Sequence, residues 1–271
     1  MIVMKVYQML RIPKVQLAIL LFFIFLSTQT KYSIATSAYL LLASVGFSIA
    51  FDLLFAFLRK RRLFMPYAAI VTGLIISLIV APDVTWYQIA TTSAVAMGAK
   101  NFLRVSGRHI FNPAAIGLFI GGIVFKQYIT WWGVSFQNIT HLTLSNAFLF
   151  LILLLPIFVS GYRMGRLYVI LTFVVAYTVF SHVFTFTFSL SSFITRLADP
   201  TIVFFATVML PEPMTSPMNP ERQVLFGLTV AVITQALSFP AVVNSLGAVG
   251  LLPDLFIPAL LLGNLLFFKS R

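Results

Sequence analysis

The feature that most constrains this chain is the recurrence of apolar runs that are roughly 15 to 24 residues long. A helix needs about 20 apolar residues to cross the ~30 Å hydrocarbon layer of a bilayer. With 60% hydrophobic residues, 9% charged residues and a mean hydropathy of +1.02, the chain has more apolar surface than a soluble core could hide. We therefore predict an all-α polytopic membrane protein that forms a single membrane domain over residues 1–271.

The apolar pattern and the charges between the runs predict about ten transmembrane helices. With ten spans, 15 of the 18 Lys and Arg residues fall on the side of the two termini, and only Lys31, Lys126 and Arg196 fall on the other side. This bias predicts cytoplasmic N- and C-termini, so the basic charge indicates topology and contact with anionic lipid rather than nucleic-acid binding. The opening residues 5–28 could instead be a cleaved signal peptide, but no A-x-A-like site follows them. The predicted spans are 15–30, 35–58, 64–82, 85–103, 112–126, 146–162, 167–186, 198–212, 222–243 and 251–268.

Two pairs of similar stretches suggest an internal repeat. "SLIVAPD" at 77–83 is similar to "ATVMLPE" at 206–212, and "NPAAIGLFIGG" at 112–122 is similar to "IPALLLGNLL" at 257–266. The similarities predict two five-helix repeats, at about 15–126 and 146–268. Because five is an odd number, the second repeat would be inverted relative to the first. The alternative is a chance similarity among apolar helix ends.

A first polar island precedes the predicted fifth helix. Asn112 can cap the free amides of that helix, and Pro113 suits its first turn because proline lacks an N–H. Lys100, Arg108 and His109 lie close before this helix N-terminus, which itself favours an anion such as a phosphate. The island therefore predicts a site for a phosphate-bearing ligand. The alternative is that these cations only enforce the topology.

A second polar island, "LPEPMTSPMNPERQ" at 210–223, has four prolines in ten positions and must be irregular backbone. Irregular backbone at membrane depth is tolerated only where it is buried in protein or lines a wet cavity, and an ionisable residue there is a functional candidate. Glu212 is thus a candidate for an ion or proton pathway. The alternative is a carboxylate at a solvated turn.

Some kinds of chemistry have no support in the sequence. The chain has no cysteine, which excludes disulfides and the thiolate ligands of iron–sulfur clusters. Histidines at the spacing of metal ligands are also absent, so we predict no metal site. Because there is neither a G-x-G-x-x-G motif nor a P-loop, the sequence offers no site for a nicotinamide cofactor. A redox reaction would therefore need a partner protein as its electron donor.

Together the two islands resemble the NqrB/RnfD family, whose members are membrane subunits of the sodium-translocating NADH:quinone oxidoreductase and of the Rnf complex. Family members carry a Lys followed by a "GRHIFNPAA"-like stretch, and later a "DPVTSP"-like stretch. Here these read "KNFLRVSGRHIFNPAAIG" at 100–117 and "EPMTSP" at 212–217, with Glu212 where the family usually has Asp. The resemblance covers most of residues 40–268.

The resemblance implies two inverted five-helix repeats, related in fold to urea channels, that hold a flavin and pass electrons. Family members bind FMN covalently through the Thr of a Ser-Gly-Ala-Thr stretch, which this sequence lacks. The flavin, FMN or riboflavin, is therefore expected to bind non-covalently. The flavin-binding candidates are Lys100, Gly107, Arg108, His109, Asn112, Pro113, Thr215 and Ser216.

The function expected from the resemblance is that of a membrane subunit in a flavin-dependent electron-transport complex of a prokaryotic inner membrane. A cytoplasmic NADH- or ferredoxin-oxidising flavoprotein would deliver electrons, a quinone or another subunit would accept them, and ion translocation would be coupled. The subunit alone would not be a catalyst. Two alternatives stay open: a small-solute channel or transporter with a urea-channel-like fold, and a structural membrane anchor for redox partners.

Overall fold

The computed structural model describes residues 8–28, 32–60, 65–126, 129–135, 144–185 and 189–270. The chain is 75% helical, which confirms the predicted all-α class. The helices of the first half are α2 (Pro13–Ser27), α3 (Ile34–Leu58), α4 (Tyr67–Ile79), α5 (Trp86–Phe102) and α6 (Pro113–Phe125). Those of the second half are α7 (Leu144–Leu154), the π-helix η1 (Phe158–Arg163), α8 (Leu167–Thr185), α9 (Leu190–Leu197), α10 (Pro200–Phe204), the π-helix η2 (Phe205–Met209), α11 (Pro220–Leu237), α12 (Pro240–Ala248), α13 (Phe256–Phe267) and the 3-10 turn η3 (Phe268–Ser270).

A polar residue followed by proline begins three of these helices. In each case the polar side chain accepts a hydrogen bond from a backbone N–H of the first turn, and the proline occupies the first helical position. This local chemistry explains where the three helices begin. The pairs are Asn112-Pro113, Asp199-Pro200 and Asn219-Pro220.

Only some of the described helices are long and apolar enough to cross a bilayer alone. These are α3 and the segment Leu167–Phe184 of α8, which correspond to the predicted spans 35–58 and 167–186. Two further candidates are helix pairs with a sharp bend, α9 with α10–η2 (44°) and α11 with α12 (75°). The helices α2, α4, α6 and α13 are apolar but shorter. The ten spans, the inverted repeat and the cytoplasmic termini therefore stay predictions.

The predicted span 222–243 differs from the structure in one respect. Helix α11 ends at Leu237, and α12 begins at Pro240 after the 75° bend. Proline has no N–H and its ring clashes with the preceding turn, so Pro240 suits the start of a new helix rather than the interior of a continuous one.

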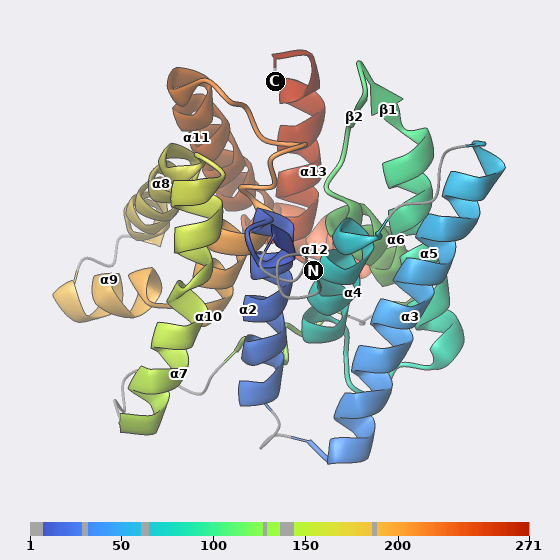
Figure 1. Ribbon diagram of the computed structural model, residues 1–271. Helices are drawn as coiled ribbons and strands as arrows, with labels where there is room; N and C mark the ends of the chain where they lie inside the picture. The colour runs from blue at the N-terminus through green and yellow to red at the C-terminus, as the bar shows by residue number, and fades with distance from the viewer. Residues whose placement is uncertain are drawn as a thin grey trace.

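The helices form two groups with short helices between them. Figure 1 shows α3, α4 and α5 on one side and α8 and α11 on the other, with α2 between them. Helix α3 packs along α4 and α5, and α11 packs along α8. Glycines permit close helix crossings: a Cβ at Gly73 of α4 would lie 2.6 Å from the Cα of Val45, and one at Gly227 of α11 would lie 2.8 Å from the carbonyl oxygen of Val169.

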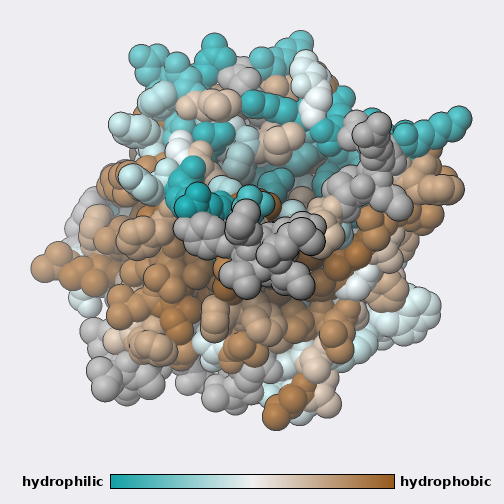
Figure 2. Space-filling view, viewed as in Figure 1, coloured by the Kyte–Doolittle hydropathy of each residue, from teal (hydrophilic) through white to brown (hydrophobic). Residues whose placement is uncertain are grey.

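The surface has the two zones expected of a membrane protein. Figure 2 shows a hydrophilic cap at one end of the molecule and a broad hydrophobic belt beneath it. Large apolar side chains are exposed along the belt-forming helices, for example Leu42 on α3 (71% exposed) and Phe158 on η1 (69% exposed). Soluble monomers rarely expose so much continuous apolar surface, so the belt agrees with a membrane protein.

Candidate functional site

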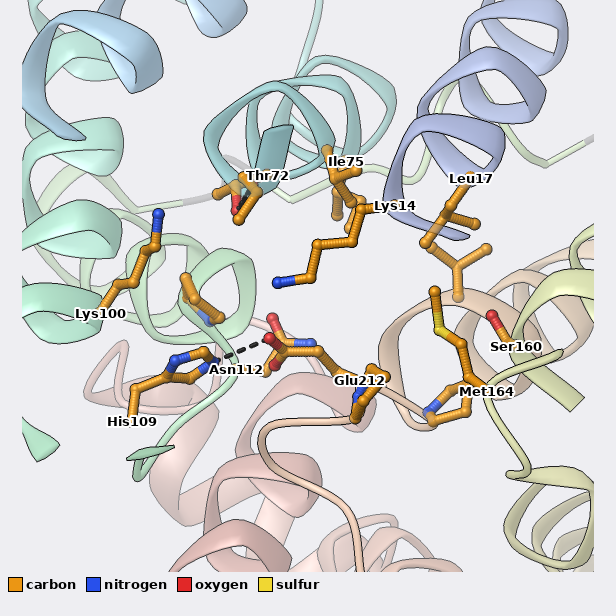
Figure 3. Close-up of a pocket in the computed structure, with 16 residues that line it drawn as sticks. Lys14, Leu17, Thr72, Ile75, Lys100, His109, Asn112, Ser160, Met164 and Glu212 are labelled. Atoms are coloured by element: carbon orange, nitrogen blue, oxygen red, sulfur yellow. Dashed lines mark hydrogen bonds and ion pairs between the residues drawn. The ribbon is translucent and has the colours of Figure 1, made fainter. Parts of the chain in front are cut away.

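The two polar islands meet in the structure. His109 Nε2 donates to Glu212 Oε1 at 2.8 Å, although 103 residues separate them in the sequence (Figure 3). His109 belongs to a short hairpin of strands β1 (Arg104–Val105) and β2 (Arg108–His109) that follows α5. The turn of the hairpin contains Gly107 at φ +81°, a conformation that glycine adopts without strain. The hairpin thus directs His109 inward.

Glu212 organises the irregular segment that follows η2. Its Oε2 accepts a hydrogen bond from Thr215 Oγ1 at 3.0 Å, and its carbonyl oxygen accepts from the N–H groups of Thr215 (3.1 Å) and Ser216 (2.9 Å). Burial opposes ionisation of the carboxyl, but the charge and hydrogen bond of His109, with Lys14 and Thr215, hold the pKa of Glu212 below its usual value. Glu212 is therefore an ionised carboxylate at neutral pH.

A buried arginine that sequence reasoning missed supports the same segment. Arg166, only 4% exposed, lies just before α8. Its Nε donates to Ser216 Oγ at 2.8 Å and its Nη2 donates to the carbonyl oxygen of Pro213 at 3.4 Å. The signal in the sequence was an Arg directly before an apolar helix, which topology alone could explain.

Asn112 connects the start of α6, the end of η2 and the interior of α13, so its role goes beyond the predicted cap. Its Oδ1 accepts from the N–H of Ala115 at 3.1 Å, which confirms that it caps α6. Its Nδ2 donates to the carbonyl oxygen of Met209, the last residue of η2, at 2.9 Å. Its own N–H donates to Oδ1 of Asn264 in α13, and Asn264 Nδ2 donates to the carbonyl oxygen of Thr215 at 3.4 Å.

Lys100 forms an ion pair with an acid that sequence reasoning did not single out. Its Nζ donates to Asp52 Oδ2 at 2.6 Å, and Asn101 Nδ2 donates to Asp52 Oδ1 at 3.0 Å. Asp52 is fully buried in α3. An aspartate within the otherwise apolar run 35–58 was the signal that could have found it.

Five of the predicted site residues line one small cavity. They are Lys100, His109, Asn112, Pro113 and Glu212, and Lys14 of α2 joins them (Figure 3). The other predicted residues, Gly107, Arg108, Thr215 and Ser216, are outside the described lining. Arg108 Nη2 instead contacts Met218 Sδ at 3.4 Å. The two islands therefore meet at one cavity, and of the three predicted phosphate-binding cations Lys100 and His109 line it while Arg108 does not.

The size of the cavity limits what it can hold. Its volume is about 40 Å³, which is room for a few water molecules or one ion. The donors and acceptors around it suit a small charged species, whereas the three fused rings of a flavin do not fit a space of this size. No flavin is therefore assigned to this cavity.

Comparison with known proteins agrees with the motifs. A family model described as the NQR2, RnfD, RnfE family matches residues 6–149, more than half of the chain. This range contains the first island, and the second island contacts it through Glu212. No curated protein matches the sequence. The chain therefore belongs to the NQR2, RnfD, RnfE family and is a membrane subunit of the Nqr/Rnf type.

Proposed function

We propose that this protein is the subunit in which an Nqr- or Rnf-type complex couples electron transfer to the movement of a monovalent cation or proton. The observation that supports this most directly is the 2.8 Å contact between His109 and Glu212 at the edge of a small, partly open cavity. An ionised carboxylate at the meeting point of short helices is the arrangement that membrane transport proteins use for coupling ions.

The atoms around Glu212 suit exchange of a cation. Its Oε1 and Oε2 accept from His109 and Thr215. The carbonyl oxygen of Met209, at the C-terminal end of η2, accepts from the Nδ2 of Asn112, which lines the same cavity. Hard cations such as Na⁺ prefer oxygen ligands, and helix C-termini offer them. A cation or proton that reaches Glu212 would replace the hydrogen bond from His109. The pair is therefore a two-state element that can be filled or empty.

The redox part of the proposal rests on the family. A non-covalent FMN or riboflavin would supply electron transfer, and its place is outside the cavity described above. A cytoplasmic NADH- or ferredoxin-oxidising flavoprotein would be the donor, and a quinone or another subunit the acceptor. The complex would lie in the inner membrane of a prokaryote, with both termini of this chain on the cytoplasmic side.

An absorbance spectrum of the purified protein tests the redox part. We expect flavin absorbance bands that bleach on reduction with dithionite. Acid precipitation should release the flavin into the supernatant, because a non-covalent flavin does not stay with the denatured protein. Colour that stays in the pellet would mean a covalent flavin. A colourless protein would contradict flavin binding by this chain and favour the channel or anchor alternatives.

The ion part is tested separately with Glu212→Gln. If the proposal is correct, this variant in the assembled complex loses cation-dependent turnover while the cytoplasmic partner still oxidises its electron donor. Unchanged cation dependence would contradict the role of Glu212.

A further inference from the structure

Lys14 has an unusual position for a cation. It is the second residue of α2, and its side chain crosses the cavity toward Glu212 (Figure 3). The N-terminus of a helix carries a partial positive charge, so a Lys in the first turn is disfavoured there unless an anion compensates for it. The only charged side chains besides Lys14 that line the described cavity are Lys100, His109 and Glu212. Glu212 is the anion among them.

The charges that face Glu212 come from several elements. From α5, Lys100 lies at the cavity, but its ammonium is already paired with Asp52 of α3 at 2.6 Å. From β2, His109 donates its hydrogen bond. From α2, Lys14 contributes an unshared positive charge. Among the charged side chains that line the described cavity, Lys14 is therefore the cation that has no carboxylate within 4.0 Å and faces Glu212.

Lys14 is close to Glu212 but does not hold it in a contact ion pair. The ion pairs within 4.0 Å among the described residues are Lys100–Asp52 and His109–Glu212, and neither includes Lys14. The cavity of about 40 Å³ thus has room for water or one ion beside the ammonium and the carboxylate. A long, flexible Lys side chain can withdraw from such a position without a change in the backbone.

Resting on the function proposed above, we propose that the Lys14 ammonium is a tethered cation that neutralises Glu212 when the site is empty and withdraws when a mobile cation binds. A carboxylate enclosed in protein is costly without a positive partner. With Lys14 in place, the empty site is stable, and a mobile cation must compete with a built-in one. Lys14 would therefore set the affinity of the site and limit leakage.

Binding of ²²Na⁺ to the purified full-length protein tests this role. The measurement compares wild type, Lys14→Met and Lys14→Arg at constant pH, with choline chloride keeping the ionic strength constant. Loss of the competing charge should raise the Na⁺ affinity of Lys14→Met about tenfold or more, because two unit charges a few ångströms apart interact strongly in a partly buried site. Lys14→Arg keeps the charge and should bind Na⁺ like wild type.

Two further variants make the result specific. Lys269→Met removes a solvent-exposed ammonium at the end of the chain and should leave the affinity unchanged. The double variant Lys14→Met with Glu212→Gln should lose the increase in Na⁺ affinity that Lys14→Met shows alone. If Lys14→Met does not elute as a folded protein, Lys14→Gln replaces it, since the amide keeps a polar end without the charge.

The outcomes separate the two proposals. If Glu212→Gln abolishes Na⁺ binding but Lys14→Met binds like wild type, the Glu212 site is correct and the tethered cation is wrong. If Na⁺ binds to none of the variants, proton binding is tested instead by following the infrared band of the Glu212 carboxyl as the pH is changed. The midpoint of this titration must then be higher in Lys14→Met than in wild type. An unchanged midpoint would overturn the role of Lys14. Na⁺ binding that survives Glu212→Gln would overturn the proposed ion site itself.

Discussion

The backbone N–H of Asn112 donates to the side-chain oxygen of Asn264 at 2.9 Å, and 152 residues separate the two in the sequence. This bond joins the start of α6 to the middle of α13, where both side chains are buried. Hydrogen bonds between polar side chains and backbone are a main source of helix association where lipid surrounds the protein. The link therefore holds α13 against the start of α6, where Asn112 and Pro113 line the cavity.

Asn264→Ala should destabilise the protein by about 1–2 kcal/mol, because the buried N–H of Asn112 and the carbonyl oxygen of Thr215 lose a partner. Thermal unfolding in detergent, followed by tryptophan fluorescence, measures the change. Asn244→Ala, at an exposed position in α12, is the matched control and should unfold like wild type. Equal midpoints for the two variants would contradict the structural role of Asn264.

Arg166→Met should loosen the segment 210–219. Its guanidinium binds Ser216 and the carbonyl oxygen of Pro213, and a hydrogen bond to a charged group contributes about 1.5–3 kcal/mol. Hydrogen exchange across this segment should become faster than in wild type. Arg163→Met removes an exposed arginine three residues away and should leave the exchange unchanged. Faster exchange in both variants would mean that Arg166 has no specific role.

Asp52→Asn should cost about 3–5 kcal/mol, because it leaves the Lys100 ammonium buried without a counter-charge. The double variant Asp52→Asn with Lys100→Met should recover part of the loss, since both charges are then gone. A double-mutant cycle of unfolding free energies measures the coupling. Strictly additive losses would show that the two groups do not act as a pair.

The stability of the folded protein should depend on pH through the ionisation of Glu212. Its pKa in the folded protein lies below the usual value of about 4.3, so its contribution is fully present above that value and disappears as the pH falls through the folded pKa. The unfolding midpoint of wild type should exceed that of Glu212→Gln at neutral pH, and the difference should shrink below about pH 4. A difference that stays constant down to pH 3 would contradict an ionised, stabilised Glu212.

Several features of the molecule were readable in the sequence because their causes are local. The apolar runs predicted an all-helical membrane protein, and the helical content and the exposed apolar belt agree with it. Asn112-Pro113 predicted the start of α6, since a cap and a first-turn proline act within four residues. The prolines of 210–223 predicted irregular backbone, and the structure has no helix from Leu210 until Pro220.

The motifs also predicted the family, which is confirmed, and placed Glu212 and His109 among the candidate functional residues. They did not predict that the two side chains are in contact, nor that Lys14 faces them. Flavin binding, the ten spans and the inverted repeat stay predictions.

The pairing of side chains was decided by tertiary structure alone. Asp52 with Lys100, His109 with Glu212, and Asn112 with Asn264 are separated by 48, 103 and 152 residues. Hydropathy and capping signals act within a single helix and contain no information about which distant helices meet. A charge or amide that is buried in protein is stable only where the packing brings an opposite charge or a hydrogen-bond partner to it. The packing of the helices therefore determines which side chains pair. The sequence by itself determined the helical membrane class, the family and the candidate residues, and the packing of short helices decided how those residues form a site.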